Sequence, residues 1–377
     1  MPLRAVAEVN LAAIERNAAL LGARVGAHVQ LCAVVKADGY GHGAVAAARA
    51  ALRGGASVLA VATAEEAGEL RRAGIEETIV VLGAISAEEL PVAVAAGAEL
   101  VAWDPGFVGQ VWASAEAEGA PIRMHVKLDT GLGRLGTREP AQALAVVHAV
   151  LDAAPALELA GVMTHFATSD TDLDFAAEQL EAFAPFVAES RALATSELTV
   201  HAANSAAVLQ VPGSDFDMVR CGIALYGGDP MNNDPADHGL EPALALRSYV
   251  AAVKPIAAGE STGYGRRFLA ERESHIATVP IGYGDGVVRA LANNCDVLIG
   301  GRRYQLCGMV SMDNITVDIG PEPAVAVGDR VTLIGLDGDE RVTAEEIARR
   351  IGTISYEVLC WVSRRVPRRY HRDGSPA

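Results

Sequence analysis

Short apolar runs alternate with alanine-rich stretches from about residue 28 to residue 220. The apolar runs are rich in β-branched residues and predict strands, whereas the alanine-rich stretches predict helices. Repeated strand–helix units are typical of a parallel sheet covered by helices, and eight units fit a closed (β/α)8 barrel better than a doubly wound sheet. Strands are predicted over residues 29–37, 57–62, 78–83, 99–103, 122–129, 157–165, 197–203 and 217–222, and helices over 44–52, 106–118, 140–151 and 173–193.

Several predicted helix starts carry a capping box, in which Ser or Thr is followed three residues later by Glu. The two side chains of such a box accept hydrogen bonds from the first free N–H groups of a helix. The pairs are Thr63 with Glu66, Ser86 with Glu89, and Thr343 with Glu346.

The pattern changes after about residue 230. Residues 231–242 are polar, contain two prolines and predict a linker. Alternating positions follow, for example over 244–253 and 274–280, and glycine-rich turns separate them. This alternation predicts a mainly β domain with one helix near 343–351.

We therefore expect an α/β chain with an N-terminal (β/α)8 TIM-type barrel over residues 1–236 and a C-terminal mainly β domain over 237–377. Reactive groups of such barrels lie at the carboxyl ends of the strands. The polar residues that end or follow a predicted strand are Lys36, Asp129, His165, Asn204 and Arg220.

Composition narrows the possible classes of protein. Of the 377 residues, 31 are Lys or Arg and 47 are Asp or Glu, a net charge of −16, which argues against binding to nucleic acid. The 51% content of hydrophobic residues argues against disorder. The five cysteines lack C-x-x-C spacing and predict reduced thiols. We expect no signal peptide, no membrane span and no metal site, and therefore a cytoplasmic protein.

The chain contains only three lysines, Lys36, Lys127 and Lys254. Lys36 follows a buried apolar strand in the segment AVVKADGYGHG (33–43), and three glycines come after it. Burial lowers the pKa of an amine, and a neutral amine is what Schiff-base chemistry requires. The alternative is a surface lysine before a glycine turn, but the barrel context and the scarcity of lysine favour a functional amine.

The segment KADGYGHG resembles the cofactor-lysine signature of the alanine racemases, which are fold-type III pyridoxal 5'-phosphate (PLP) enzymes. The resemblance covers essentially the whole chain and implies PLP-dependent interconversion of L- and D-alanine, which supplies D-alanine for peptidoglycan. Further matching segments, in the family's order, are HVKLDTGLGRLG (125–136), GVMTHFATSD (161–170), HAANSAA (201–207), VRCGIALYG (219–227), GESTGYGRRF (259–268), PIGYGDG (280–286), MVSMDN (309–314), ISYEV (354–358) and RVPRRY (365–370).

The resemblance implies two catalytic bases. Lys36 would hold PLP as a Schiff base and act as one acid/base, and Tyr264 would act on the opposite face of the substrate Cα. A tyrosine pKa near 10 is too high for this task unless neighbours stabilise the phenolate. His165 and Arg220 would form the polar chain that does so. Without the resemblance, Tyr264 reads as a turn residue in a glycine-rich loop.

Arg220 is implied to face the pyridine nitrogen of PLP, where most PLP enzymes place a carboxylate. Arginine can only donate hydrogen bonds, so the ring nitrogen would stay unprotonated. A weaker electron sink limits side reactions and suits an enzyme that only moves a proton. Considered alone, Arg220 reads equally well as a salt-bridged residue of a barrel.

The remaining site residues are also implied by the resemblance. Asn204 and Ser205 read equally well as the start of a helix, a role compatible with phosphate binding. The phosphate ligands would be Tyr40, Ser205, Tyr356 and the backbone N–H groups of Gly222 and Ile223. The substrate carboxylate would be bound by Arg134 and the backbone of Met312. Lys127, which is often carbamylated in relatives, would hold Arg134 in place. Asp313 would orient the Tyr264 region, and Tyr283 would narrow the entrance of the site.

The family also implies a head-to-tail homodimer, because its tyrosine base reaches the lysine of the other subunit. Tyr264, Tyr283, Met312 and Asp313 would then enter the partner's site. Two-fold closure is the default for a homo-oligomer.

Some positions depart from the family pattern and affect the entrance and the packing behind the site. Cys221 stands where relatives usually have proline, and Val287 and Val288 replace a usual Tyr-Pro. Ser311 and Asn314 flank the Met-Asp pair where other residues are common. These departures bear on substrate breadth and rate more than on the type of reaction.

Three other functions are alternatives to alanine racemase activity. A broader amino-acid racemase usually carries a secretion signal, and Tyr356 at the pocket wall favours a small methyl side chain. A PLP-dependent decarboxylase should show a carboxylate in place of Arg220. A single-barrel PLP-carrier protein would lack the second domain and with it Tyr264.

Overall fold

The computed structural model describes residues 3–377, so residues 1–2 of the predicted first domain lie outside the described residues. The chain forms two compact units, and each is discontinuous in sequence. The barrel unit comprises Glu15–Gly39 and Ala44–Leu225, and the mainly β unit comprises residues 3–14, 40–43 and 226–377. This division differs from the single boundary between residues 236 and 237 that the sequence pattern predicted.

The barrel unit contains eight parallel strands in the order β8-β7-β6-β5-β4-β3-β2-β9. The N–H groups of Asp217 and Arg220 donate to the carbonyls of Val200 (3.0 Å) and Ala203 (2.9 Å), which brings the end strands β8 and β9 together. The predicted (β/α)8 barrel is thereby confirmed. The strands are β2 (Gln30–Val34), β3 (Val58–Val61), β4 (Thr78–Val81), β5 (Glu99–Ala102), β6 (Ile122–Lys127), β7 (Leu157–Met163), β8 (Thr199–His201) and β9 (Met218–Cys221).

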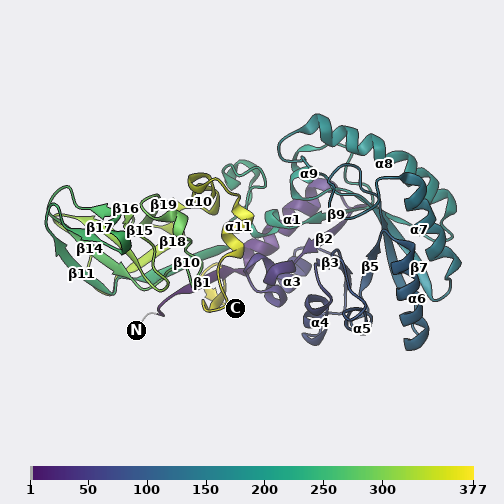
Figure 1. Ribbon diagram of the computed structural model, residues 1–377, viewed down its shortest axis with the longest axis horizontal. Helices are drawn as coiled ribbons and strands as arrows, with labels where there is room; N and C mark the ends of the chain where they lie inside the picture. The colour runs from purple at the N-terminus through teal and green to yellow at the C-terminus, as the bar shows by residue number, and fades with distance from the viewer. Residues whose placement is uncertain (1–2) are drawn as a thin grey trace. The chain divides into compact units, whose positions relative to one another are not determined.

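Helices surround these strands (Figure 1). The buried face of α3 consists of five alanines, which let this helix approach the sheet closely, whereas α7 buries mainly valine. The helices are α1 (Leu11–Val25), α3 (Ala44–Arg53), α4 (Ala64–Arg72), α5 (Leu90–Ala95), α6 (Pro105–Glu118), α7 (Pro140–Asp152), α8 (Leu173–Leu193) and α9 (Ser205–Gln210), and the short α2 (Lys36–Tyr40) follows β2.

Two of the predicted capping boxes differ in whether they start a helix. The Thr63–Glu66 box is complete at the start of α4. Ser86 and Glu89 also exchange backbone and side-chain hydrogen bonds, but they close a turn, and α5 begins only at Leu90. Pro91 explains the late start, because a proline without an N–H fits the first turn of a helix.

The second unit is mainly β, as predicted, with an eleven-stranded sheet in the order β11-β14-β17-β16-β15-β18-β10-β1-β20-β21 and β19 paired to β18. Its strands are β10 (Leu244–Tyr249), β11 (Ala252–Ile256), β12 (Ser261–Thr262), β13 (Phe268–Leu269), β14 (Ser274–Val279), β15 (Asp296–Ile299), β16 (Arg302–Cys307), β17 (Ile315–Gly320), β18 (Arg330–Asp337), β19 (Glu340–Val342), β20 (Arg368–Arg372) and β21 (Ser375–Pro376). Its helices are α10 (Ala344–Ile351) and α11 (Ser355–Cys360), with 3-10 turns at Ile223–Tyr226, Pro235–His238, Tyr264–Arg266 and Arg289–Leu291.

The strand β1 (Val6–Asn10) belongs to this second sheet. It pairs antiparallel with β10 and parallel with β20, so both of its edges are hydrogen-bonded. Its alternate residues Ala7 and Val9 are fully buried. The N-terminal segment that precedes the barrel in sequence is therefore an internal strand of the mainly β unit.

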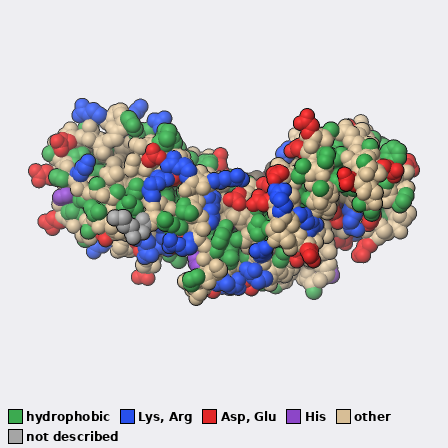
Figure 2. Space-filling view, turned by 90° about the horizontal axis from the view of Figure 1, so that it is seen from below, with side chains coloured by type: hydrophobic (Ala, Val, Ile, Leu, Met, Phe, Trp, Pro, Cys, Tyr) green, Lys and Arg blue, Asp and Glu red, His purple; other side chains and the backbone are tan. Residues whose placement is uncertain are grey.

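The surface and the cysteines agree with a folded, reduced protein. Acidic, basic and hydrophobic side chains are mixed over the face drawn in Figure 2. All five cysteines are free thiols, and only Cys360 is exposed. In the described part of the chain, no helix has the length and apolar character needed to cross a membrane.

Candidate active site

Lys36 lies at the carboxyl end of β2, where the backbone enters a left-handed turn. Ala37, Asp38, Gly39 and Tyr40 have φ values of 52°, 55°, 61° and 52°. The left-handed conformation costs a non-glycine residue about 1–2 kcal/mol, so the surrounding structure must hold this turn in place. Such stored strain is concentrated at functional sites. The turn presents the half-buried Lys36 at the barrel mouth.

The carboxylate of Glu66 holds the start of this turn. Its Oε1 accepts a hydrogen bond from the Ala37 N–H at 2.6 Å. Its Oε2 accepts from the N–H groups of Ala62 at 2.8 Å and Thr63 at 3.2 Å. Glu66 therefore joins the end of β3 to the residue that follows Lys36. On the other side of the turn, Asp38 accepts a hydrogen bond from the Ala44 N–H at 3.0 Å.

Replacing Glu66 with glutamine is expected to loosen this turn, because one carboxylate oxygen becomes an NH2 group that faces backbone donors. We expect a loss of about 1–2 kcal/mol in the free energy of unfolding, measured by urea denaturation. Glu65→Gln is the matched control, since Glu65 is exposed and pairs only with the exposed Arg72 in the described structure. Equal stability of the two variants would contradict the role of Glu66.

Arg220, on β9, is buried at the same end of the barrel. Its Nη1 donates to His201 Nδ1 at 2.8 Å, and its Nη2 lies 3.0 Å from His165 Nδ1. Nη2 also reaches the carbonyl oxygens of Thr164 (2.9 Å) and Ala202 (3.0 Å). Burial lowers the pKa of the Arg220 guanidinium to about 10, so it remains charged at neutral pH. Among the described residues, no carboxylate forms an ion pair with Arg220.

His165 follows β7 and is surrounded by positive charge. Burial, together with the nearby Arg220 and Lys127, lowers its pKa well below the usual histidine value. Arg134 and Lys36 act on it in the same direction. His165 is therefore neutral at physiological pH, and the four cations around it form a strongly electropositive site. Such a field favours an anionic ligand.

Lys127, at the end of β6, is buried within this cation cluster. The pKa of its amine is lowered to about 8, chiefly by burial and also by Arg220 and Arg134, while Asp129 partly opposes them. Asp129 also fixes the following loop, since its carboxylate accepts from the N–H groups of Gly131 and Gly133 at about 3 Å. Arg134 extends from this loop and is exposed.

The predicted phosphate ligands fall into two local groups. In the barrel unit, Ser205 Oγ accepts from the Gly222 N–H at 2.9 Å, and Ile223 follows directly. Asn204 is the N-cap of α9, where its side chain accepts from the Ala207 N–H at 3.0 Å, so the expected helix start is confirmed. In the mainly β unit, the rings of Tyr40 and Tyr356 are 6.2 Å apart.

Four predicted site residues lie on exposed turns of the mainly β unit. Tyr264, Tyr283 and Met312 are 73%, 42% and 51% exposed, values unusual for large hydrophobic side chains. The Gly284 N–H donates to the Met312 carbonyl at 2.9 Å, which joins two of these turns. Asp313 forms an ion pair with Arg365 at 2.6 Å, so its observed partner is an arginine.

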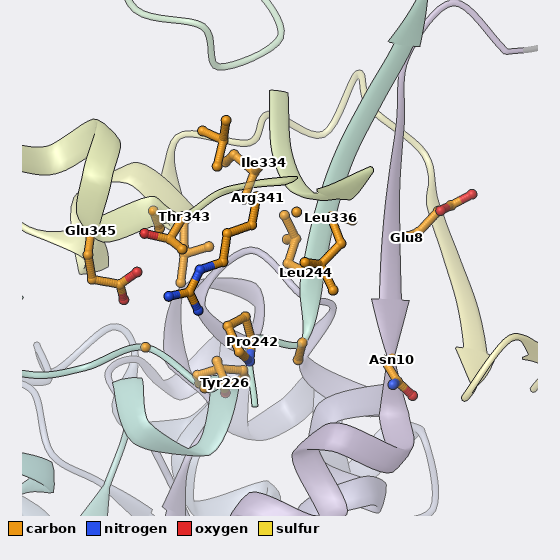
Figure 3. A pocket seen from close by; sticks show the side chains of 18 of the residues that line it. Glu8, Asn10, Tyr226, Pro242, Leu244, Ile334, Leu336, Arg341, Thr343 and Glu345 are labelled. Carbon is orange, nitrogen blue, oxygen red and sulfur yellow. The ribbon is translucent and has the colours of Figure 1, made fainter. Parts of the chain in front are cut away.

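The mainly β unit also contains a cavity of about 260 Å³ (Figure 3). Leu244, Ile334 and Leu336 form much of its wall, and Arg341 and Glu345 contribute charged groups. Within residues 3–377, its lining includes none of the predicted site residues. The cavity is therefore distinct from the cation cluster.

Sequence reasoning missed four side chains that contact or extend the site: Glu66, Glu99, His125 and His201. Glu66 was assigned only a capping role, and His201 belongs to a matched segment without an assigned role. Glu99 and His125 carried one available signal, because polar residues within apolar barrel strands require partners.

The barrel fold places a lysine and a set of further cations at its strand ends, which is where barrel enzymes hold their reactive groups. Two family models match the chain: "Alanine racemase, N-terminal domain" over residues 9–230 and "Alanine racemase, C-terminal domain" over residues 243–370. The chain belongs to the alanine racemase family, whose members are isomerases.

Individual relatives agree with this assignment over almost their full length. Alanine racemase 1 of Bacillus subtilis is 40% identical over 372 residues, which span 98% of this chain and 93% of the relative. Alanine racemase of Symbiobacterium thermophilum is 42% identical over 371 residues, 97% of this chain and 96% of the relative. The crystal structure of alanine racemase from D-cycloserine-producing Streptomyces lavendulae has a TM-score of 0.94 and 37% identity, and covers 98% of both chains.

Proposed function

We propose that this protein is a PLP-dependent alanine racemase, which interconverts L- and D-alanine with two bases. The observation that carries the proposal is the cation cluster of Lys36, Lys127, Arg134 and Arg220 around the neutral His165. Alanine and PLP both carry anionic groups, and this cluster attracts them. Family membership supports the choice of reaction.

The donor set of this chain fits PLP. When bound, PLP supplies an electron sink that makes the Cα proton of an amino acid acidic. Lys36 is the amine that would hold the cofactor, and Arg220 would face its ring nitrogen as a pure donor. The phosphate would be bound by Tyr40, Ser205, Tyr356 and the N–H groups of Gly222 and Ile223.

The two bases divide the proton transfer between opposite faces of the substrate. Lys36 Nζ would accept or return the Cα proton on one face, and the Tyr264 phenol oxygen would do so on the other. His165 and Arg220, in contact at 3.0 Å, would supply the positive field that stabilises the phenolate. Arg134 and the Met312 backbone would orient the substrate carboxylate.

We also propose that the site is completed by a second copy of the chain. The exposure of Tyr264, Tyr283 and Met312 supports this, because all three are large side chains left uncovered on the mainly β unit, and a second copy would cover them. Asp313, also exposed, would enter the partner's site with them. Placed there, Tyr264 would face the partner subunit's lysine.

The low pKa of Lys127 makes it a candidate for carbamylation. The neutral amine nitrogen attacks CO2, releases one proton and becomes an anionic carbamate, which would balance Arg220 and Arg134. Because the amine pKa is about 8, we expect ¹³C-bicarbonate to label Lys127 more strongly at pH 8 than at pH 6, where the ammonium dominates. Carbon-13 NMR would detect the carbamate.

Lys127→Arg should abolish the carbamate signal. Lys254→Arg, at an exposed position on β11, is the matched control and should retain it. A signal that survives Lys127→Arg would contradict this assignment.

A racemase assay across a panel of L-amino acids tests the proposed function. We expect alanine to be racemised at least about tenfold faster than larger amino acids, because Tyr356 would limit the pocket to a methyl group. Comparable rates for large side chains would favour a broad amino-acid racemase, and release of CO2 would favour a decarboxylase.

We also propose that the enzyme acts in the cytoplasm, where its thiols stay reduced. Its D-alanine would be used for peptidoglycan synthesis.

A further inference from the structure

A line of buried polar side chains crosses the interior of the barrel. Glu99, at the start of β5, accepts from His125 Nε2 at 2.7 Å. His125 Nδ1 lies 2.9 Å from His201 Nε2, and His201 Nδ1 lies 2.8 Å from Arg220 Nη1. All four residues are at most 8% exposed. Three strands besides β9 thus contribute to a continuous hydrogen-bonded line that ends at the active-site arginine.

The two ends of this line have opposite and fixed polarity. Arg220 has only donors, and an ionised carboxylate has only acceptors. Burial raises the pKa of the Glu99 carboxyl, but the pKa lies below its usual value, because His125 and Arg123 donate hydrogen bonds to the carboxylate and Arg123 adds a positive charge. Glu99 is therefore ionised at neutral pH.

These fixed ends leave one arrangement for the protons between them. Because Arg220 donates to His201 Nδ1, the His201 proton must lie on Nε2. That proton is donated to His125 Nδ1, so the His125 proton lies on Nε2 and is donated to Glu99. A doubly protonated His125 would set two N–H groups against each other, and His201 would have to lose its one N–H proton and become an imidazolate to avoid it.

The same reasoning applies to the branch toward His165. Arg220 Nη2 donates to His165 Nδ1 at 3.0 Å, which places the proton of the neutral His165 on Nε2. The other acceptors of Nη2 are backbone carbonyls, so His201 is the side chain that aligns Nη1. The other His201 tautomer would set an Nδ1–H donor against the Arg220 Nη1 donor and push Arg220 from its position.

We propose that Glu99 is a positioning residue of the active site, which acts through His125 and His201 to hold Arg220 and His165 in one hydrogen-bond arrangement. Glu99 is itself held by an ion pair with Arg123 at 2.6 Å. Its expected effect on the rate rests on the proposed racemase function, whereas the tautomer assignment rests on the geometry alone.

The test uses three variants of the full chain. Glu99→Met removes the acceptor at similar volume, and Glu99→Gln keeps one acceptor oxygen. Glu158→Met is the matched control: Glu158 accepts from the same Arg123 at 2.7 Å, but in the described structure it contacts neither histidine. Nitrogen-15 NMR of histidine-labelled protein, without added cofactor, reads the tautomer and charge of each imidazole.

In the wild type and in Glu158→Met, we expect His125, His201 and His165 to be neutral with the proton on Nε2. Glu99→Gln should preserve these tautomers and, through its acceptor oxygen, the hydrogen bond of the His125 Nε2–H, whereas Glu99→Met leaves this N–H without its acceptor and should shift the Nε2 resonance of His125. With cofactor bound, Glu99→Met should lower kcat about 10- to 100-fold and change KM less, because Glu99 would orient active-site residues without contacting the substrate. Glu99→Gln should retain most of the wild-type kcat.

An Nδ1–H or a charged imidazole in the wild-type line would overturn the proposal without any variant, even if Glu99→Met does not fold. An unchanged His125 Nε2 resonance in a folded Glu99→Met would overturn it as well. Failure of the proposed racemase function would leave the NMR result intact, so the two outcomes can be distinguished.

Discussion

Lys36→Ala is expected to yield a colourless protein that does not racemise alanine. Lys36 is the lysine at the carboxyl end of β2, and removing its amine eliminates both the covalent hold on PLP and one of the two bases. We expect the rate to fall by at least about 1,000-fold, the combined effect of losing a nucleophile and an acid/base group. Absorbance at the PLP band and a coupled D-alanine assay measure the two losses.

The control for this variant is Lys254→Ala, at an exposed position of β11 that is not among the predicted site residues. It should keep both colour and activity. Borohydride should bleach the wild type and this control permanently by reducing the bond to Lys36. A coloured Lys36→Ala protein that still racemises alanine would refute the proposed function.

Tyr264→Phe is expected to block proton abstraction on one face while PLP stays bound. The phenol oxygen is the only part of the side chain that can carry a proton, and phenylalanine keeps the ring. We expect a decrease of about 100- to 10,000-fold in the conversion of L- to D-alanine, which is the usual contribution of one acid/base group. Tyr304→Phe, on β16, is the control and should retain full activity.

A mixed dimer separates a shared site from a site within one chain. If Tyr264 reaches the partner's Lys36, a heterodimer of Lys36→Ala and Tyr264→Phe has one site with both wild-type residues and one site with neither. Such heterodimers, purified with two different tags, should recover about half of the wild-type activity per dimer. Purified heterodimers without activity would contradict a shared site.

Local patterns predicted most of the barrel. Each predicted strand contains the observed one, because β-branched runs and helix caps act within a few residues. The position of β1 was missed, since its partners Arg247 and Arg368 lie far along the chain and only the folded sheet brings them together. The five residues of β1 contain no sequence signal that indicates which sheet the strand joins.

The candidate site likewise contains residues that local sequence patterns predicted and residues whose contacts depend on the folded barrel. Lys36, His165 and Arg220 were predicted because each ends or follows a strand of a parallel barrel. Glu99 and His125 lie at strand positions whose side chains enter the barrel interior, where a contact depends on which strands face one another. Glu66 was assigned to its own helix, and its bond to Ala37 depends on the packing of β2 beside β3.

The position of β1 also sets an order of events during synthesis. β1 is translated before both of its neighbours, and β20 follows it by about 360 residues, roughly 20–70 s at ordinary elongation rates. Both edges of β1 lack partners until β10 is made, and the edge that pairs with β20 stays open until Arg368 is made, which is a risk for aggregation. A nascent chain stalled before Arg368 should therefore need a chaperone on its first ten residues.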